Sequence, residues 1–354
     1  MRRLNFQGAK INVGFDVHLK SWKVTVMTND LVLKTFTQPP SPKILINYLH
    51  KNYPGASYYT AYEAGFCGFW IHYELVKYGI NSIVVNPADI PTTHKEKVQK
   101  EDKRDSKKIA RGLANGELVG IYIPSTHTLA DRSLVRTRDS IVGDLRRYKQ
   151  RIKSILMFNG IVIPEQFDKS SCWSNRFFNW LKEIPMSHDT AKQSLDLLIN
   201  QCLLLRSSVL TITKQIHALS KTDRYRKNVT LLISIPGIGI LTAMSLLTEL
   251  EDIKRFRNND HLCSFIGLSP TSDSSGDKEK VGNITMRANA LLRSTLIECA
   301  WMTIRKDPAL LNSYLRYCQR MDKNKAIVRI AKKLVHRIQF VLKNQIPYQL
   351  MKVG

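Results

Sequence analysis

The chain has 354 residues, which is long enough for two or three domains with cores of their own. Its 54 Lys and Arg residues against 29 Asp and Glu give a formal net charge of +25, and this excess favours a polyanionic partner, nucleic acid before an anionic membrane. The N-terminus lacks the apolar core of a signal peptide and no uninterrupted apolar run is long enough to span a membrane, so we expect a soluble, intracellular protein.

The first part of the chain, residues 1–124, alternates strand-like and helix-like patterns. Trp22, Val24 and Val26 alternate with polar positions, as a strand with one wetter face requires. The pair Asn115-Gly116 is typical of a helix end. These patterns predict an α/β domain. We expect strands over 11–16, 22–27, 31–36, 58–63 and 82–85, and helices over 41–52, 69–78 and a segment that ends near residue 115.

Four acids in this region suggest a metal site. Asp16 closes the apolar run INVGFD and Glu63 closes the β-prone run YYTAYE, while Asp102 and Asp105 stand three residues apart at the start of a predicted helix. Hard divalent cations take oxygen ligands, and Mg²⁺ typically uses a few carboxylates together with water and phosphate. A single acid of this kind is usually a solvated surface residue. Four of them in this order indicate one site.

The spacing of the last two acids supports the same interpretation. Asp102, Asp105, Ile109 and Leu113 share one stripe of the predicted helix, so the acids point toward the body of the domain with the apolar residues. Buried carboxylates need a counter-charge. The neighbouring Lys and Arg residues fall on other faces of the helix, which favours a metal ion. The six scattered cysteines form no Cys-x-x-Cys pair and argue against zinc and against a disulfide framework.

The middle part, residues 125–224, changes to long helices with heptad spacing. One reading of the seam is a coiled coil between chains, and the other is an antiparallel hairpin within one chain; the sequence leaves both open. An aromatic segment over 172–185 lies between the two helices, either as a cap on the hairpin or as a contact for a partner. The two seams consist of Leu134, Ile141, Leu145, Tyr148, Ile152 and Ile155, and of Leu195, Leu198, Cys202, Leu205, Val209, Ile212, Ile216 and Leu219.

The last part, residues 225–354, is predicted to be mainly helical and to bind nucleic acid. Pro-Gly-Ile-Gly between two apolar helices resembles a helix-hairpin-helix element, in which Gly237 and Gly239 would let backbone N–H groups approach a phosphate. An ordinary interhelical turn would have the same sequence pattern. In the helix over 321–345, basic residues lie mostly off the apolar stripe and are expected to follow a phosphate backbone. The nominated residues are Arg329, Lys332 and Lys333.

A polar segment, TSDSSGD over 271–277, contains the candidate nucleophile Ser275. Composition alone predicts a flexible loop there, and neither a Gly-x-Ser-x-Gly elbow nor a triad-like His and Asp accompanies the serine. The serine could act as a nucleophile if nearby cations held a phosphodiester beside it. Those cations are Lys278, Lys280, Arg287 and Arg293.

At this point the chain resembles transposases of the insertion-sequence 110 family, which are RNA-guided recombinases. One block of motifs is GFD, YEAG and EDKRD, similar to the family's RuvC-like domain with its Asp-Glu-Asp-Asp site. The other is SIPGIG followed by FIGLSPTSDSSGDKEKVGNITMRANALLR, similar to the family's C-terminal transposase domain. The middle of the chain is similar only in being helical. Phe66 stands where the family often has Thr-Gly, and Ser106 stands where Ala is common.

The resemblance implies roles for the nominated residues. Asp16, Glu63, Asp102 and Asp105 would hold Mg²⁺, or Mn²⁺, in an RNase H-like fold. Ser275 would attack DNA and form a covalent phosphoserine, with Ser274 beside it as the second candidate. A structured guide RNA would pair with donor and target DNA, and sites shared between subunits would form in a dimer that assembles to a tetramer. The protein would work in a prokaryotic cytoplasm, associated with the nucleoid.

Several other functions are compatible with parts of the sequence. A RuvC-like endonuclease would use water as the nucleophile, and an invertase of the same family would reverse a DNA segment. A sugar-kinase-like ATPase shares an early strand-end Asp, but the net charge of +25 and the absence of a Gly-rich phosphate loop argue against it. A DNA-binding regulator without activity would have no use for four aligned acids. DNA strand cleavage and exchange is therefore the preferred hypothesis.

Overall fold

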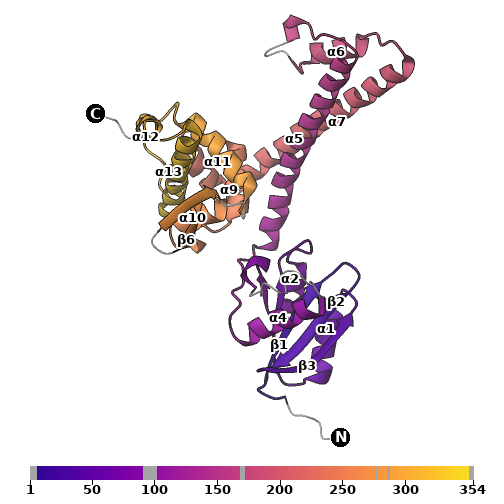
Figure 1. The fold of residues 1–354 in the computed structure, drawn as a ribbon, viewed down its shortest axis with the longest axis vertical. Helices are drawn as coiled ribbons and strands as arrows, with labels where there is room; N and C mark the ends of the chain where they lie inside the picture. The colour runs from indigo at the N-terminus through magenta and orange to yellow at the C-terminus, as the bar shows by residue number, and fades with distance from the viewer. Residues whose placement is uncertain (1–5, 91–101, 168–171, 276–277, 285–287, 351–354) are drawn as a thin grey trace. The chain divides into compact units, whose positions relative to one another are not determined.

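The computed structural model of the chain describes residues 6–90, 102–167, 172–275, 278–284 and 288–350, and for 102–104, 270–275 and 278–284 it describes the backbone only. Contacts divide the chain into two compact units, residues 1–123 and 124–354 (Figure 1). The boundary lies one residue from the predicted end of the first domain. The predicted further division at residue 224 stays a prediction.

The first unit is built on a five-stranded mixed sheet. Its strands are β1 (Lys10–Val17), β2 (Trp22–Thr28), β3 (Leu31–Gln38), β4 (Ser57–Glu63) and β5 (Asn81–Val85). The strand order is β3-β2-β1-β4-β5, with β1 antiparallel to β2, β2 antiparallel to β3, and β1, β4 and β5 parallel. All five strands lie where the apolar runs predict them.

Helices cover the two faces of this sheet. α1 (Pro42–Asn52) and α2 (Trp70–Lys77) lie on one face, where Phe15 stacks on Trp22 and Tyr62 with ring centroids 5.3 and 5.2 Å apart. α4 (Asp102–Ala114) packs across β1, β2 and β4, and its Ile109 joins strand residues of β4 and β5 in a separate buried cluster. The alternation of side chains along each strand therefore separates an aromatic face from an α4 face.

Two long helices begin the second unit and form a hairpin within one chain. α5 (Thr126–Phe158) packs along α7 (Asp189–Ser220), and α6 (Asn175–Glu183) lies at the far end of the pair (Figure 1). The helices run antiparallel, because Ile152 shares a cluster with Leu195, whereas Arg138 Nε donates to Thr213 Oγ1 at 2.9 Å. The single-chain alternative is thus confirmed for these seams. Pairing between chains stays a prediction.

The aromatic segment between these helices caps the hairpin. Phe177 contacts Trp173, Trp180 and Phe167, with ring centroids 5.0 to 5.4 Å apart, and these rings pack with the ends of α5 and α7. α7 is the one helix of the described residues that is long and apolar enough to suit a membrane span. Its buried positions pack on α5 and α9, and a core helix passes the same test of length and composition.

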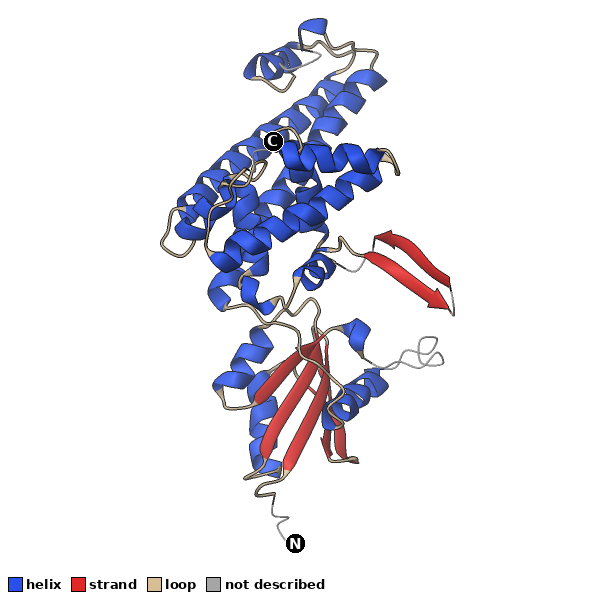
Figure 2. Cartoon of the chain, turned by 90° about the vertical axis from the view of Figure 1, so that its left-hand side faces the viewer, coloured by secondary structure: helices blue, strands red, loops and turns tan. Residues whose placement is uncertain are grey.

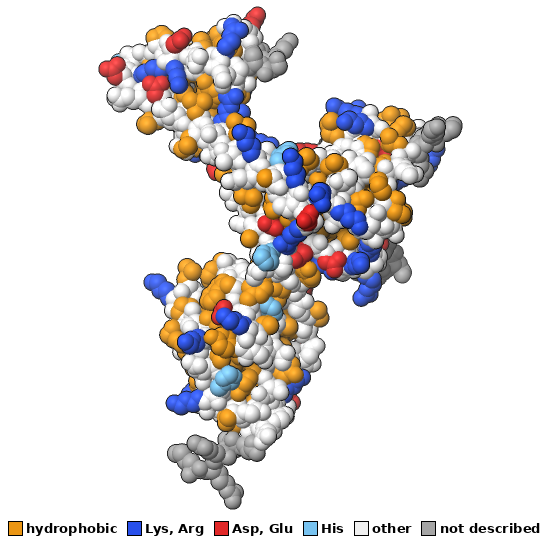
Figure 3. All heavy atoms as spheres, turned by 180° about the vertical axis from the view of Figure 1, so that it is seen from behind, with side chains coloured by type: hydrophobic (Ala, Val, Ile, Leu, Met, Phe, Trp, Pro, Cys, Tyr) orange, Lys and Arg blue, Asp and Glu red, His pale blue; other side chains and the backbone are white. Residues whose placement is uncertain are grey.

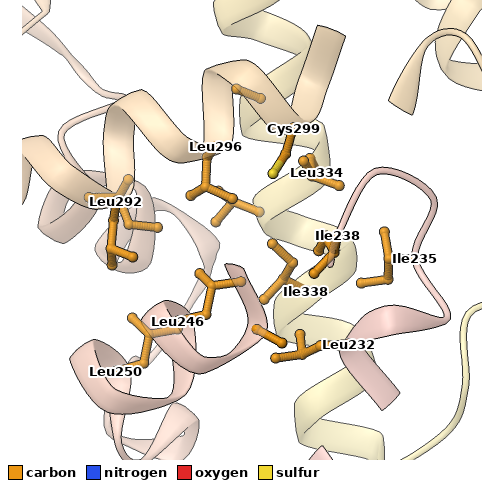
Figure 4. Packing of buried hydrophobic residues seen from close by; sticks show 14 of the residues in the cluster. Leu232, Ile235, Ile238, Leu246, Leu250, Leu292, Leu296, Cys299, Leu334 and Ile338 are labelled. Carbon is orange, nitrogen blue, oxygen red and sulfur yellow. The ribbon is translucent and has the colours of Figure 1, made fainter. Parts of the chain in front are cut away.

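The rest of the second unit is a helical bundle with a continuous core. α8 (Arg226–Ile233), α9 (Ile240–Leu250), α10 (Asn259–Ile266), α11 (Ala290–Thr303), α12 (Pro308–Cys318) and α13 (Lys323–Asn344) make up the bundle. Side chains from α8, α9, α11 and α13 point toward one another, among them Leu232, Leu246, Leu296 and Ile338 (Figure 4). α13 carries the predicted apolar stripe, and its Ile327, Ile330, Leu334, Ile338 and Val341 are all buried.

A β-hairpin interrupts this bundle between α10 and α11. β6 (Pro270–Ser275) pairs antiparallel with β7 (Lys278–Ile284), and the hairpin projects from the helices of its unit (Figure 2). The prediction of an irregular loop over 271–277 is therefore wrong for 271–275. The segment contains Asp, which is depleted in strands, and many small polar residues, but antiparallel backbone pairing with Lys278–Ile284 overrides that preference.

Candidate active site

Asp16 and Glu63 lie at the same edge of the sheet and on the same face. β1 and β4 are parallel and Phe15 pairs with Tyr62, so the residues that follow them come side by side at the carboxyl ends of the two strands. Phe15 and Tyr62 both face the aromatic cluster under α1 and α2. Because successive side chains of a strand point to opposite faces, Asp16 and Glu63 face the side that α4 covers.

Gly14 brings the third acid to this face. A Cβ atom at Gly14 would overlap the backbone nitrogen of Ala110 and the carbonyl oxygen of Ser106, so the glycine lets α4 lie against β1 at backbone distance. Ser106 is fully buried, and its Oγ lies 2.9 Å from Thr25 Oγ1 on β2. The hydroxyl at a position where the resemblance expects Ala is thus accommodated. Asp105 precedes Ser106 and is carried to the face of Asp16 and Glu63.

These acids have basic neighbours and are accessible to solvent. Asp16 Oδ2 lies 3.0 Å from His18 Nε2, and Asp105 Oδ1 lies 3.7 Å from Lys108 Nζ. The side chains of Asp16 and Asp105 are 20% and 19% exposed. Partial exposure allows an ion to reach them, and the charge of Lys108 offsets part of their repulsion.

The donor set fits a hard cation, although the described side chains do not form a closed cage. Among the residues that the structure describes, no three His, Cys, Asp or Glu lie close enough together to hold an ion. Asp102 begins α4, one helical turn before Ser106, and its side chain lies outside the described atoms. Carboxylate oxygens suit Mg²⁺ and Mn²⁺, which keep several water ligands and need few protein ones. The assignment of the four acids to one metal site stays a prediction.

The candidate nucleophile lies in the second unit, at the end of β6. Ser275 pairs with Lys278, and Lys280 lies opposite Asp273 in the register of the hairpin. Only the backbone of β6 and β7 is described, so nothing follows about where these side chains point. Arg287 lies outside the described residues. Arg293 lies in the first turn of α11, after the segment that returns from the hairpin. The predicted roles of Ser274, Ser275 and these cations remain untested.

The two glycines of the Pro-Gly-Ile-Gly segment differ in their surroundings. Gly237 has a φ of +89°, and a Cβ there would lie 2.6 Å from Thr303 Oγ1 and 2.8 Å from Cys299 O on α11. Thr303 Oγ1 also donates to Pro236 O at 2.7 Å. Packing against α11 therefore explains Gly237. Gly239 is exposed, starts α9 and has open space around it, so a phosphate contact at this helix N-terminus stays a prediction.

The nominated cations of α13 lie beside an aromatic ring that the sequence did not single out. Arg329 and Lys333 are exposed, and their charged groups lie 5.6 and 5.7 Å from the centre of the Tyr317 ring on α12. Lys333 Nζ donates to Ser313 Oγ at 3.1 Å, while Lys332 is half-buried. Arg316 is exposed on α12, and Arg320 is exposed in the turn that follows this helix. The two arginines, four positions apart, could have pointed to this region.

Basic side chains extend over much of the second unit. In the view of Figure 3, Lys and Arg side chains follow the long helical hairpin and continue over the bundle. The residues of α5 that contribute include Arg146, Arg147, Arg151 and Lys153. This distribution gives a polyanion several places to bind, in agreement with the formal net charge of +25.

Comparison with known proteins assigns both ends of the chain. Residues 13–159 match a transposase family whose name combines the Asp-Glu-Asp-Asp site with insertion sequence IS110, and residues 229–315 match the transposase IS116/IS110/IS902 family. The first match contains all four nominated acids and the second contains Ser275.

Individual relatives agree with this assignment. A putative transposase, y4qE of Sinorhizobium fredii, is 29% identical over 71% of this chain and 60% of its own length. The transposase for insertion sequence element IS1533 of Leptospira borgpetersenii is 26% identical over 72% of this chain and 74% of its own. The transposase for IS1111A of Coxiella burnetii is 25% identical over 77% and 74%. The chain thus spans less than two thirds of the first relative named here. On these matches, which together cover residues 13–159 and 229–315, the chain belongs to the IS110 family of transposases.

Proposed function

We propose that this protein cleaves and exchanges DNA strands as a transposase, with the acids of the first unit and Ser275 of the second as its chemical groups. The observation that carries the proposal is the placement of Asp16 and Glu63 on adjacent parallel strand ends, on the face where α4 brings Asp105. The strand order β3-β2-β1-β4-β5, with three parallel strands, is that of an RNase H-like sheet. The family match over 13–159 supports the same reading.

The residues divide the work between holding a phosphate and attacking it. Asp16, Glu63, Asp102 and Asp105 would hold Mg²⁺, which when bound neutralises developing charge on a phosphodiester and orients it. The hydroxyl of Ser275 would form the new bond to phosphorus while one P–O bond of the DNA breaks. The phosphoserine retains a phosphodiester bond, so the strand can be rejoined to a new partner without an external energy source. A transposase needs this property, and a nuclease does not.

A covalent adduct distinguishes the two chemistries. Wild-type protein incubated with element-end DNA, the RNA of the element and Mg²⁺ should give a protein–DNA species that survives denaturing electrophoresis. Ser275→Ala should abolish this species and leave DNA binding within a few-fold of wild type, whereas Ser274→Ala is the matched control that should retain it. An adduct in Ser275→Ala but not in Ser274→Ala would transfer the role to Ser274. Cleavage without any adduct would instead support the RuvC-like endonuclease.

We further propose that a structured RNA directs the choice of DNA sequence and that the protein acts as a dimer that assembles to a tetramer. The support is family membership together with the excess of basic residues on the second unit. Protein without RNA should bind DNA with little sequence preference, and the RNA of the element should create a preference that follows its loops. Strong selection of one DNA sequence by RNA-free protein would contradict the guided mechanism. Inversion rather than transposition would leave all these outcomes unchanged.

A further inference from the structure

A buried carboxylate, Glu249, joins three separate segments of the second unit. Glu249 lies at the C-terminal end of α9 and is 3% exposed. Its Oε1 accepts from Arg136 Nε at 2.6 Å and its Oε2 accepts from Arg136 Nη2 at 2.8 Å. The two hydrogen bonds make a two-point contact between Glu249 and Arg136 of α5. The hydrogen bonds to Glu249 hold the pKa of Arg136 above its usual range. Asn289 Nδ2 donates to the same Oε2 at 2.8 Å.

Asn289 is the point where the β6–β7 hairpin returns to the bundle. Its Oδ1 accepts from the backbone of Leu292 at 3.0 Å and caps α11, while its own backbone N–H donates to Phe265 O at 3.3 Å. Phe265 lies on α10 shortly before β6, and Asn289 follows β7. The two ends of the hairpin segment are therefore joined to each other and, through Glu249, to α5.

The same end of α9 also holds the beginning of α5. Arg132 Nε donates to Thr248 O at 2.8 Å, and Glu251 accepts from Ser125 Oγ at 2.6 Å and from Thr128 Oγ1 at 2.7 Å. Glu251 adopts a φ of +55°, which a non-glycine residue rarely takes. Three consecutive turns of α5 are thus fixed to the segment from which Glu249 reaches the hairpin.

Stability alone does not account for such an arrangement. Only one partner of this ion pair is buried, since the Arg136 side chain is 56% exposed, and desolvation of the Glu249 carboxylate offsets part of the attraction between the two charges. What the pair does provide is a fixed geometry, since a two-point Arg–carboxylate contact tolerates little displacement. The contact lies at the base of the one β-hairpin that the described residues of this unit contain.

We propose that Glu249, through Asn289 and Arg136, is a positioning residue that fixes the base of the β6–β7 hairpin to α5 and thereby sets the place of Ser275. The inference rests on the proposed role of Ser275. The inference adds to the proposed machinery a residue that touches neither the DNA nor the reacting atoms. It also adds a connection to the hairpin from the start of α5, the helix that follows the first unit in sequence.

Asn289→Ser tests the proposal without removing the helix cap. Serine can accept the capping hydrogen bond, as Asn289 does, but it has no amide to donate to Glu249. The matched control is Asn258→Ser, because Asn258 caps α10 by accepting from His261 N at 2.9 Å and makes no hydrogen bond with a carboxylate of the described residues. The two variants undergo the same chemical change, so a difference between them reports the contact with Glu249.

The first readout is hydrogen–deuterium exchange of the full chain. In Asn289→Ser, amides of β6 and β7 should exchange roughly ten-fold faster or more, the factor expected when a hydrogen bond to a charged group is lost. Asn258→Ser should leave these amides unchanged. Asn289→Asp, which keeps the cap but places a second carboxylate against Glu249, should exceed the effect of Asn289→Ser. Equal exchange at the hairpin in Asn289→Ser and Asn258→Ser would overturn the proposal whatever the chemistry of the enzyme.

The second readout is the rate of covalent adduct formation at saturating DNA. Asn289→Ser should slow this rate roughly ten-fold or more while the midpoint of thermal unfolding stays close to that of Asn258→Ser. An unchanged rate, or a loss that only follows the loss of thermal stability, would reduce Glu249 to a structural role. If wild-type protein forms no adduct, the proposed function fails, and the exchange experiment still decides whether Glu249 holds the hairpin.

Discussion

The acid-bearing edge of the first unit and the serine-bearing hairpin of the second are held in place by different means. Asp16 and Glu63 take their positions from strand register, and Asp105 takes its own from the backbone contact between α4 and Gly14. The hairpin is a two-stranded sheet on its own, and two isolated strands are marginal in water. The segments that flank the hairpin are joined instead by Asn289, whose side chain donates to Glu249 and whose backbone N–H donates to Phe265 O.

The difference teaches where each site should be sensitive. A site that is fixed by close-packed backbone should respond most to added volume, because packed interiors resist even one extra methyl group. A site that is fixed by polar contacts should respond most to the loss of single hydrogen-bonding groups. The first unit should therefore fail by displacement of α4, and the hairpin by loss of its connection to the bundle.

The largest effect is expected from neutralising the acids. Asp16→Asn, Glu63→Gln and Asp105→Asn keep the shape of each side chain but remove a charged ligand. Each should therefore reduce DNA strand cleavage by roughly 10²–10³-fold, the range seen when a group that stabilises charge is removed. The measurement is cleavage of labelled DNA in Mg²⁺.

The control for the acids is Asp30→Asn. Asp30 is exposed in the turn between β2 and β3, at the other end of these strands from Asp16. This variant should cleave DNA as wild type does, and all variants should bind DNA similarly. Full cleavage activity in any one of the three site variants would remove that residue from the proposed metal site.

The next effect is expected from Gly14→Ala. The added methyl group overlaps the backbone of α4, so the helix must move, at a cost of about 1–3 kcal/mol in the free energy of unfolding. Movement of α4 also carries Asp105 away from Asp16, so the stabilisation that Mg²⁺ gives to wild-type protein in thermal unfolding should shrink. Both quantities can be measured in the same series of melting curves.

Gly143→Ala supplies a control of opposite sign. Gly143 lies within α5 and a Cβ there meets nothing within 4 Å, so alanine should stabilise the protein by up to about 1 kcal/mol through its higher helix propensity. A neutral or stabilising Gly14→Ala would show that α4 is not held at backbone distance and would break the contrast between the two regions.

Gly14 and Gly237 show what the sequence can and cannot predict. The strands of the first unit, the long helices and the stripe of α13 follow from hydrophobic periodicity, which local sequence records directly. Gly14 lies within a predicted strand and Gly237 in a segment predicted to be a phosphate-binding element or a turn, yet each provides a close contact with a helix distant in sequence. No local pattern distinguishes these uses, because the contact partner is set by the tertiary fold.

The hairpin and its anchor illustrate the same limit. Thr271–Ser275 has a loop composition, and its strand depends on pairing with residues 278–284. Glu249 lies in an apolar helix where a lone acid reads as an exposed end, and its partners Arg136 and Asn289 are 113 and 40 residues away. The places of Asp16 and Glu63 were predictable because each lies at the end of a regular strand, while their assignment to one metal site stays a prediction. The hairpin anchor was not predictable, because its members come together only through packing.

A smaller effect is expected at the C-terminal end of the bundle. Burial alone would raise the pKa of Asp307, but hydrogen bonds from Tyr348 and from the backbone of Leu310, with the charge of Arg337, hold it below its usual range. Burial, together with the hydrogen bond to Asp307, raises the pKa of Tyr348 to about 12. Asp307→Asn should therefore lower the free energy of unfolding at pH 7 by about 1–3 kcal/mol, the cost of leaving charged partners unpaired.

The pH dependence of this difference gives a second check. A depressed pKa in the folded protein means that the stabilisation is present above the unfolded pKa of about 3.9 and is lost as the pH falls through the lower, folded value. The difference between wild type and Asp307→Asn in urea unfolding should hold from pH 7 to pH 5 and decrease below pH 4. Tyr348→Phe should destabilise less, since it removes one neutral donor. A difference that grows toward low pH would contradict the assignment.

The smallest effect is expected from single cations beside Tyr317. Arg329→Gln or Lys333→Gln should weaken DNA binding only a few-fold and should lower the slope of log affinity against log salt by about 1, the value for one phosphate contact. Lys51→Gln, at the exposed end of α1, is the control and should leave the slope unchanged. A cation that neutralises a phosphate favours binding by releasing counterions from DNA of any sequence. The loss of affinity should therefore be equal for specific and unrelated DNA. A loss confined to one DNA sequence would mean that Arg329 or Lys333 contacts bases. An unchanged slope would place the DNA elsewhere on the second unit.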